Sequence, residues 1–148
     1  MMLPPYSHTE YLEKQLMPTE LPQSHLDLLD GAVVISLATV MPDGQPQVTP
    51  VWCSRHDNEI WVNSTLGRQK AHNMKERPQV TILAVDPTHP LRYIEVRGRV
   101  VDTDNGEAAV QHIENLSHLY DGQPFRKLGP TERRCIFKIQ PTRVNIGG

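Results

Sequence analysis

Apolar and polar residues alternate along much of this chain, and the alternation predicts mainly β structure. Six strands are expected, at residues 32–40, 47–54, 59–64, 79–85, 92–102 and 134–139. Turn residues such as Pro42-Asp43-Gly44 separate the first three strands, which we therefore expect to form a meander. Short strands with hairpin connections around a few helices favour an antiparallel barrel with flanking helices over a doubly wound sheet.

Apolar residues recur at helical spacing in the remaining segments. Helices are predicted at residues 24–29, 67–76 and 106–120, the first opened by Ser24 and closed by Gly31. Residues 1–23 carry four of the thirteen prolines and predict an N-terminal arm with a short helix at residues 8–17. Leu12, Leu16 and Met17 share helical spacing there, so we expect the arm to pack at an interface. Residues 24–148 are then a single domain.

Length and charge exclude several classes of protein. The 148 residues suit one domain, and 15 Lys and Arg against 17 Asp and Glu leave a net charge of −2. Without an overall positive field, neither nucleic acid nor an anionic membrane is an expected partner. The chain shows no apolar run long enough to span a bilayer and no signal-peptide pattern, so we expect a cytoplasmic protein. Cys53 and Cys135 lack metal-binding spacing and are interpreted as core residues, and no metal site is expected.

The most informative segment is residues 63–74, where a strand ends in polar residues and a helix begins. Ser64, Thr65, Arg68 and Lys70 surround this junction. A helix N-terminus carries unpaired N–H groups and the positive end of the helix dipole, both of which favour an anion. The segment therefore predicts a cradle for a phosphorylated cofactor. The alternative is an ordinary exposed helix start with solvated cations.

Several other residues allow two interpretations. Pro50 marks either a strand end or an edge or bulge where a ligand meets the backbone. Trp52 and Trp61 fit simple core positions. His112 and His118 lie six residues apart and do not share a helix face, so both are predicted to lie at the surface. The usual motifs of hydrolases, zinc enzymes, Rossmann folds and Walker-type nucleotidases do not occur.

Four blocks of sequence carry a family resemblance. They are Leu37-Ala38-Thr39-Val40 with Asp43-Gly44, Pro46-Gln47-Val48-Thr49-Pro50-Val51-Trp52, Gly67-Arg68-Gln69-Lys70-Ala71-His72-Asn73 and Arg92-Tyr93-Ile94-Glu95-Val96-Arg97-Gly98. In order and spacing, over residues 26–144, the chain resembles the pyridoxamine 5′-phosphate oxidase-like FMN-binding split β-barrels, and within them the branch of probable coenzyme F420-dependent (deazaflavin) oxidoreductases. The resemblance implies a split β-barrel with a Greek-key-like antiparallel arrangement, and a homodimer with two cofactors at the subunit interface.

The resemblance also implies cofactor-binding positions. Residues of one strand would line the tricyclic ring, the polar end of the next strand would follow, and a basic block would hold the phosphate. These residues are Val48, Thr49, Pro50, Val51 and Trp52, then Asn63, Ser64 and Thr65, then Arg68, Lys70 and Ala71. Tyr93 matches a position contributed across the dimer, and Arg92 would reach the same place. Catalytic residues stay unassigned.

The function that the resemblance implies is transfer of a hydride from reduced coenzyme F420 to a flat conjugated small-molecule acceptor. An FMN-dependent oxidoreductase of the same fold is the first alternative, and a non-catalytic carrier of flavin or deazaflavin is the second. Four cations are candidate partners for the anionic tail of the deazaflavin, or are solvated surface charges: Lys75, Arg77, Arg126 and Lys127. No counterpart of the family's C-terminal Trp and Arg substrate segment follows Val144, so oxidation of pyridoxamine phosphate itself is not expected.

Overall fold

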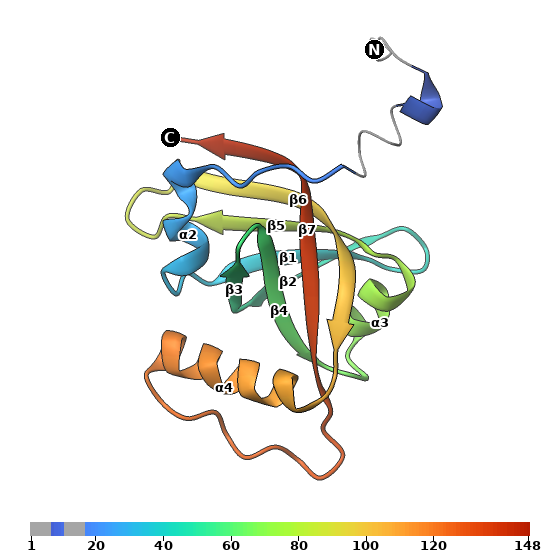
Figure 1. Ribbon diagram of the computed structural model, residues 1–148, viewed down its shortest axis with the longest axis vertical. Helices are drawn as coiled ribbons and strands as arrows, with labels where there is room; N and C mark the ends of the chain where they lie inside the picture. Colours follow the sequence, from blue (N-terminus) through green and yellow to red (C-terminus); the bar gives the residue numbers. More distant parts are fainter. Residues whose placement is uncertain (1–6, 11–16) are drawn as a thin grey trace.

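The computed structural model describes residues 7–10 and 17–148 and is built around one antiparallel sheet (Figure 1). Its seven strands are β1 (Ile35–Val40), β2 (Pro46–Val51), β3 (Cys53–His56), β4 (Glu59–Thr65), β5 (Gln79–Val85), β6 (Tyr93–Asp104) and β7 (Arg134–Gly147). Their order across the sheet is β2-β1-β5-β6-β7-β4-β3, and every neighbouring pair runs antiparallel. This confirms the antiparallel, mainly β prediction.

The two edges of this sheet are joined by a single residue. β2 and β3 lie at opposite edges, yet only Trp52 separates them along the chain. The sheet must therefore curve until its edges come close, which gives it the form of a barrel (Figure 1). The consecutive pairings of the predicted meander are present, since β2 pairs with β1 and β3 pairs with β4, but they lie at opposite edges of the sheet. The strand predicted at residues 47–54 is accordingly two strands, which belong to different edges.

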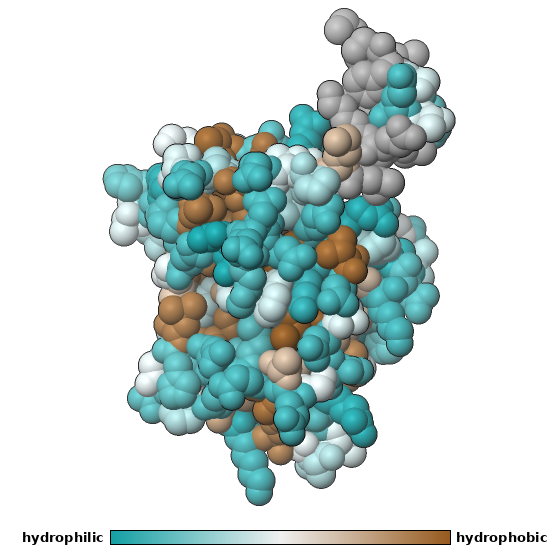
Figure 2. Space-filling view, viewed as in Figure 1, coloured by the Kyte–Doolittle hydropathy of each residue, from teal (hydrophilic) through white to brown (hydrophobic). Residues whose placement is uncertain are grey.

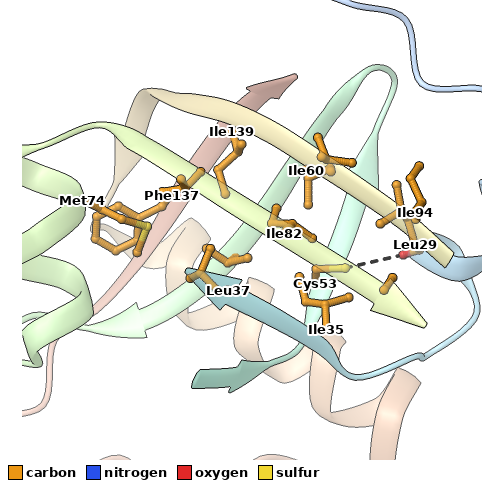
Figure 3. Close-up of a cluster of buried hydrophobic side chains, with 14 of the residues drawn as sticks. Leu29, Ile35, Leu37, Cys53, Ile60, Met74, Ile82, Ile94, Phe137 and Ile139 are labelled. Carbon is orange, nitrogen blue, oxygen red and sulfur yellow. Dashed lines mark hydrogen bonds between the residues drawn. The ribbon is translucent and has the colours of Figure 1, made fainter. Parts of the chain in front are cut away.

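Alternate residues of the strands fill the interior of the barrel. The burial patterns of β1 and β4 alternate along their whole length, as expected for strands with one face on a core. Figure 3 shows the resulting cluster, in which Leu37 and Ile82 lie among side chains from β6 and β7. Cys53 belongs to this core, with its Sγ 3.7 Å from the Leu29 carbonyl oxygen. Burial raises the pKa of the Cys53 thiol to about 12, which agrees with its interpretation as a core residue.

Two helices frame one end of the barrel. Helix α3 (Gln69–Glu76) follows directly after β4, and helix α4 (Glu107–Asp121) packs against β7 and β4. In Figure 1, α4 lies below the sheet, and residues 122–133 return beneath it to β7. Gly122 ends α4 in the left-handed conformation, at φ 67°. Both helices are within one or two residues of their predicted bounds.

The first predicted helix is only partly present. A 3-10 turn, η1 (Gln23–His25), precedes a four-residue helix, α2 (Asp27–Asp30). Ser24 does not cap a helix as predicted, since its Oγ lies 2.8 Å from the ring nitrogen Nδ1 of His25. Gly31 does end α2, and its N–H donates to the Asp27 carbonyl oxygen.

The last strand is longer than predicted, since β7 continues past Pro141 to Gly147. A proline lacks the N–H that a strand ladder needs, so a sequence pattern stops there. The pairing of β6 with β7 shifts register between Arg97 and Gly98, opposite Pro141, and this bulge accommodates the proline.

The described part of the N-terminal arm makes hydrogen bonds within itself and with the barrel. Ser7 and Glu10 exchange capping hydrogen bonds, 2.7 and 3.2 Å long, at the start of the predicted helix. The N–H and Oγ1 of Thr19 donate to the carbonyl oxygens of Pro141 and Thr142 on β7. Leu12 and Leu16, on which the predicted interface packing of the arm depends, lie outside the described residues.

Candidate functional site

A cavity of about 430 Å³ opens where the barrel edges, β4, α3 and α4 converge. Its size is in the range of pockets that hold small organic ligands. Apolar and basic residues from separate parts of the chain line it, and none of the lining residues is acidic. They are Val34, Pro50, Val51, Trp52, Asn63, Arg68, Lys70, Ile113, Leu116, Phe125, Arg126 and Arg134.

One side of the cavity is apolar and partly aromatic. Trp52 stacks on Tyr120 of α4 with ring centroids 5.2 Å apart and an interplanar angle of 15°. The same helix presents Ile113 and Leu116 to the cavity, and Phe125 of the following loop completes this wall. Flat apolar walls of this kind suit a conjugated ring, because both can give up their hydration on contact.

Basic residues form the other side. Lys70 projects from the first turn of α3, and its Nζ donates to Thr49 Oγ1 at 2.9 Å, which connects the helix to β2. Burial, followed by repulsion from Arg68 and Arg134, lowers the pKa of Lys70. This cation therefore lies among like charges, which an anionic ligand would relieve.

Arg134 at the start of β7 is the most buried of these cations, with 7% of its surface exposed. Its Nε donates to Asn63 Oδ1 at 2.9 Å, and its Nη1 donates to Thr65 Oγ1 at 2.7 Å and to Glu132 Oε2 at 3.0 Å. Burial lowers the pKa of Arg134, whereas Glu132 opposes the shift. Sequence reasoning missed this residue. The signal was a charged residue at the start of an otherwise apolar strand, where burial of the charge requires partners.

The Glu132 carboxylate forms ion pairs with two arginines, Arg126 and Arg134. Arg126 donates to both of its carboxylate oxygens, at 2.7 and 2.9 Å, and the Gly129 N–H donates to Oε1 at 3.1 Å. These contacts, with Arg126 first, lower the pKa of Glu132 to about 2. The guanidinium groups of Arg126 and Arg134 both lie over the Phe125 ring, with Cζ atoms 4.9 and 5.4 Å from its centroid.

A chain of hydrogen bonds runs from Arg134 through Asn63 toward the surface. The Asn63 amide Nδ2 donates to the Ala109 carbonyl oxygen at 2.9 Å and to Nδ1 of His112 at 3.1 Å. His112 Nε2 lies 2.8 Å from Ser54 Oγ, which is 2.9 Å from Nε2 of the exposed His56. The predicted surface position of His112 is wrong, since only 6% of it is exposed. Spacing between two histidines could not reveal a partner on another strand.

The predicted cofactor-binding residues do not all lie together. Pro50, Val51, Trp52, Asn63, Arg68 and Lys70 line the cavity, and Thr49 and Thr65 contact residues that line it. Ser64 faces the barrel interior, and its Oγ is the one fully buried side-chain polar atom without a partner in the described part of the chain. Ala71 is also in the core. Val48 is 59% exposed on the outer face of β2, and Tyr93 lies at the start of β6. Their roles in binding stay predictions.

The four candidate partners of an anionic tail do not lie together. Arg126 lines the cavity, whereas Arg77 has a structural role, with its Nε donating to the Val40 carbonyl oxygen at 2.7 Å. Lys75 and Lys127 are exposed. Arg92, proposed to act across a dimer, is bound to Asp27 at 2.7 Å and to Asp86 at 2.9 Å in its own chain.

Three further features concern metal ligands, membrane-spanning helices and the polarity of the surface. Among residues 7–10 and 17–148, no three His, Cys, Asp or Glu side chains cluster as metal ligands would. Within those ranges no helix has the length and apolar character needed to cross a membrane. Figure 2 shows one face of the molecule, on which hydrophilic residues predominate and apolar residues form small patches.

Comparisons with known proteins agree with this arrangement. Residues 21–146 match the family described as pyridoxamine 5′-phosphate oxidase, and no curated protein matches the chain. A solved structure described as F420 reductase is 33% identical, with a TM-score of 0.76 over 84% of this chain and 98% of its own. The conserved hypothetical protein Rv2991 from Mycobacterium tuberculosis is 24% identical, with a TM-score of 0.67 over 88% and 86%. The heme storage protein HutZ from Vibrio cholerae is 16% identical and shares the fold, with a TM-score of 0.60 over 88% and 96%.

Proposed function

Because the chain belongs to the pyridoxamine 5′-phosphate oxidase family, we propose that it is an oxidoreductase that uses reduced coenzyme F420 to reduce a flat conjugated acceptor. The observation that carries the proposal is the composition of the cavity, which joins an aromatic and aliphatic wall to four basic residues. A phosphorylated tricyclic cofactor has the same division between an apolar ring and an anionic side chain. The similar structure described as F420 reductase favours the deazaflavin over FMN.

The residues of the cavity have separate tasks in this proposal. Arg68 and Lys70 hold the phosphate at the start of α3, where backbone N–H groups add to their charge. Trp52 and the backbone around Pro50 orient the ring. Bound coenzyme F420 supplies the hydride chemistry, so the protein contributes binding, orientation and exclusion of water. None of the described residues that line the cavity is a carboxylic acid, and no proton donor is assigned.

The same cavity suits FMN, which is the second candidate. FMN has a ring of similar shape and one phosphate but lacks the oligoglutamate tail of the deazaflavin. Arg126, in the loop between α4 and β7, lines the cavity and is about half exposed. A tail that extends out of the cavity could therefore reach it, which favours the longer, more anionic cofactor. A carrier that binds either cofactor without turnover is the third candidate.

A fluorescence titration of the purified protein with coenzyme F420 and with FMN, at one salt concentration, tests the proposal. We expect the deazaflavin to bind more tightly, and the loaded protein to oxidise it when a conjugated acceptor is added. Tighter binding of FMN would transfer the protein to the flavin-dependent class. Tight binding of F420 without oxidation by any acceptor in a broad panel would favour the carrier.

Replacing Lys70 by Ala tests the phosphate assignment. A hydrogen bond to a charged group contributes about 1.5–3 kcal/mol, so we expect Lys70→Ala to weaken cofactor binding by about tenfold or more. Arg133→Ala removes one positive charge from an exposed residue outside the cavity and is the matched control. An unchanged dissociation constant for Lys70→Ala would remove Lys70 from the phosphate site.

We also propose that two copies of the chain form the functional unit. The outer faces of β2, β1 and β5 carry several apolar residues around Ser36, hereafter the outer sheet face: Ala38, Val48, Pro50, Leu83 and Val85. β2 contributes Pro50 and Val51 to the cavity as well, so a second copy packed on this face would lie beside the bound cofactor.

A further inference from the structure

The cavity contains the guanidinium group of Arg134, which the protein holds in place without satisfying all of its hydrogen-bond donors. An arginine has five N–H donors, and the described residues accept three from Arg134, one from Nε and two from Nη1. Its Nη2 has no hydrogen-bond partner in the described part of the chain. Nη2 is also absent from the fully buried unpartnered atoms, which there comprise Ser64 Oγ alone, so it keeps access to solvent. Because Arg134 lines the cavity and its Nε and Nη1 are already engaged, Nη2 is the donor that remains for a ligand there.

The contacts of Arg134 fix its plane. Asn63 Oδ1 accepts from Nε, and this leaves the two N–H groups of the Asn63 amide for Ala109 and His112. The amide orientation is thus determined by three partners at once. His112 must then accept at Nδ1 and donate from Nε2 to Ser54. A guanidinium held from one side in this way presents its remaining amino group in one direction, at little further cost in side-chain entropy.

The charge around Arg134 is not balanced. Lys70 and Arg68 both lie close enough to interact with it electrostatically. Among the described residues Glu132 is its one carboxylate partner, and Glu132 also binds Arg126. Burying a cation is unfavourable unless it is paired, so three neighbouring cations with one shared carboxylate form a site with excess positive charge. A phosphate, with one negative charge and two free oxygens as a diester and one more of each as a monoester, matches that excess better than a ring carbonyl.

We infer that Arg134 is a third phosphate-binding residue of the cavity, and that its Nη2 donates to the phosphate oxygens of the bound cofactor beside Lys70 and Arg68. In this arrangement β7 and α3 hold the phosphate from two sides. The contacts with Asn63 and Thr65 fix the orientation of the Arg134 side chain before a ligand binds. This inference rests on the proposed function, because it assigns a residue to the same cofactor.

Pairs of ligands that differ in the phosphate give the sharpest test. FMN and riboflavin share the ring and differ in the phosphate alone, and coenzyme F420 can be compared with its chromophore without the phosphate-bearing tail. We expect Arg134→Gln to weaken binding of FMN and of F420 by about 10- to 100-fold, the effect of losing a hydrogen bond to a charged group. Binding of riboflavin and of the bare deazaflavin should change by less than about twofold.

Two further variants separate binding from structure. Arg133→Gln removes the same charge from the adjacent, exposed residue and should leave all four dissociation constants unchanged. Arg134→Lys keeps the charge without the planar fork and should recover part of the affinity for the phosphorylated ligands. Thermal unfolding of each variant, recorded beside the titrations, identifies loss of fold.

The outcomes are distinct. An equal loss for FMN and riboflavin in Arg134→Gln would show a ring contact or a general structural role, and would overturn the inference while the proposed function stands. Unchanged binding of FMN and F420 in that variant would also overturn it. Failure of the unmodified protein to bind any of the four ligands would overturn the proposed function, and the inference with it.

Discussion

At the scale of single residues, His112 shows how a neighbour sets the protonation state. Asn63 donates to Nδ1 of His112. Protonation of the neutral ring would add a proton at Nδ1 and place two donors against each other. Burial, followed by the charges of His56 and Arg134, lowers the pKa of His112 to about 4, from an ordinary value of 6.5. The neutral ring is therefore part of the structure that holds Asn63 and, through it, Arg134.

This lowered pKa predicts a dependence of stability on pH. Between pH 6.5 and about 4 the unfolded chain binds a proton at His112 that the folded protein does not, so the free energy of unfolding falls as the pH falls through that window. At 1.36 kcal/mol per pKa unit, the loss is about 3 kcal/mol. Urea unfolding at pH 7, 5.5 and 4 measures it.

His112→Leu should be less stable at pH 7, because Asn63 and Ser54 lose a partner, but its stability should decline less between pH 7 and 4. His118→Gln, at the exposed histidine of the same helix, should keep the decline of the unmodified protein. The carboxylates with lowered pKa, among them Glu132, lose their contribution mainly below pH 4.5 and are common to all three proteins. Equal declines in His112→Leu and the unmodified protein would contradict the prediction.

At the scale of elements, the attachment of α4 decides whether the cavity exists. Tyr120 near the end of α4 donates its hydroxyl to the Val33 carbonyl oxygen at 2.8 Å and accepts from the Cys53 N–H at 3.1 Å. These bonds reach the backbone just before β1 and at the start of β3. Trp52, which precedes β3, stacks on the Tyr120 ring. One side chain thus joins the apolar wall on α4 to the wall on Trp52.

Tyr120→Phe keeps the ring and removes both hydrogen bonds. The Cys53 N–H and the Val33 carbonyl oxygen then lose a partner, so we expect the free energy of unfolding to fall by about 1–3 kcal/mol. Cofactor binding should weaken as well, because Trp52 is less firmly held. Leu119→Ala, at the 48% exposed neighbour, should change stability by less than about 0.5 kcal/mol. If both variants have the same stability in urea unfolding, the hydroxyl does not attach the helix.

At the scale of the whole molecule, the outer sheet face is the strongest indication of a second copy. Cross-strand pairing places Val48 beside Ala38, and Pro50 and Leu83 on either side of Ser36. Val48 is 59% exposed, and Leu83 and Val85 are each 37% exposed. Exposed apolar residues grouped in this way, on a sheet that also lines the cavity, favour an interface with another chain.

Light scattering during size exclusion should therefore give twice the 16.8 kDa mass of the chain. We expect Val48→Glu with Leu83→Glu to produce a monomer, because two buried carboxylates at an apolar interface would be unpaired. Val110→Glu, on the exposed side of α4, should remain a dimer. A monomeric unmodified protein, or a double variant of unchanged mass, would exclude this face as the interface.

The sequence by itself determined the local structure and the chemical character of the site. Alternation located β5 within its observed bounds, the helical period located α3 and α4, and the basic block around Lys70 marked the basic side of the cavity. These features depend on neighbours in the chain, and periodicity records such neighbours directly.

Only the tertiary structure decided which distant segments meet. It separated β2 from β3 at Trp52, since pairing with β1 and with β4 is a property of partners far along the chain. The tertiary structure also extends β7 beyond Pro141, because a bulge opposite Gly98 accommodates a proline that has no N–H to donate. It also buried His112 against Asn63 and brought Arg134 into the cavity, 71 residues beyond the asparagine that orients it. Closure of the barrel determines which side chains become partners. Such pairs produce no periodic pattern in the sequence, because burial and hydrogen bonding depend on distance in space and not on separation along the chain.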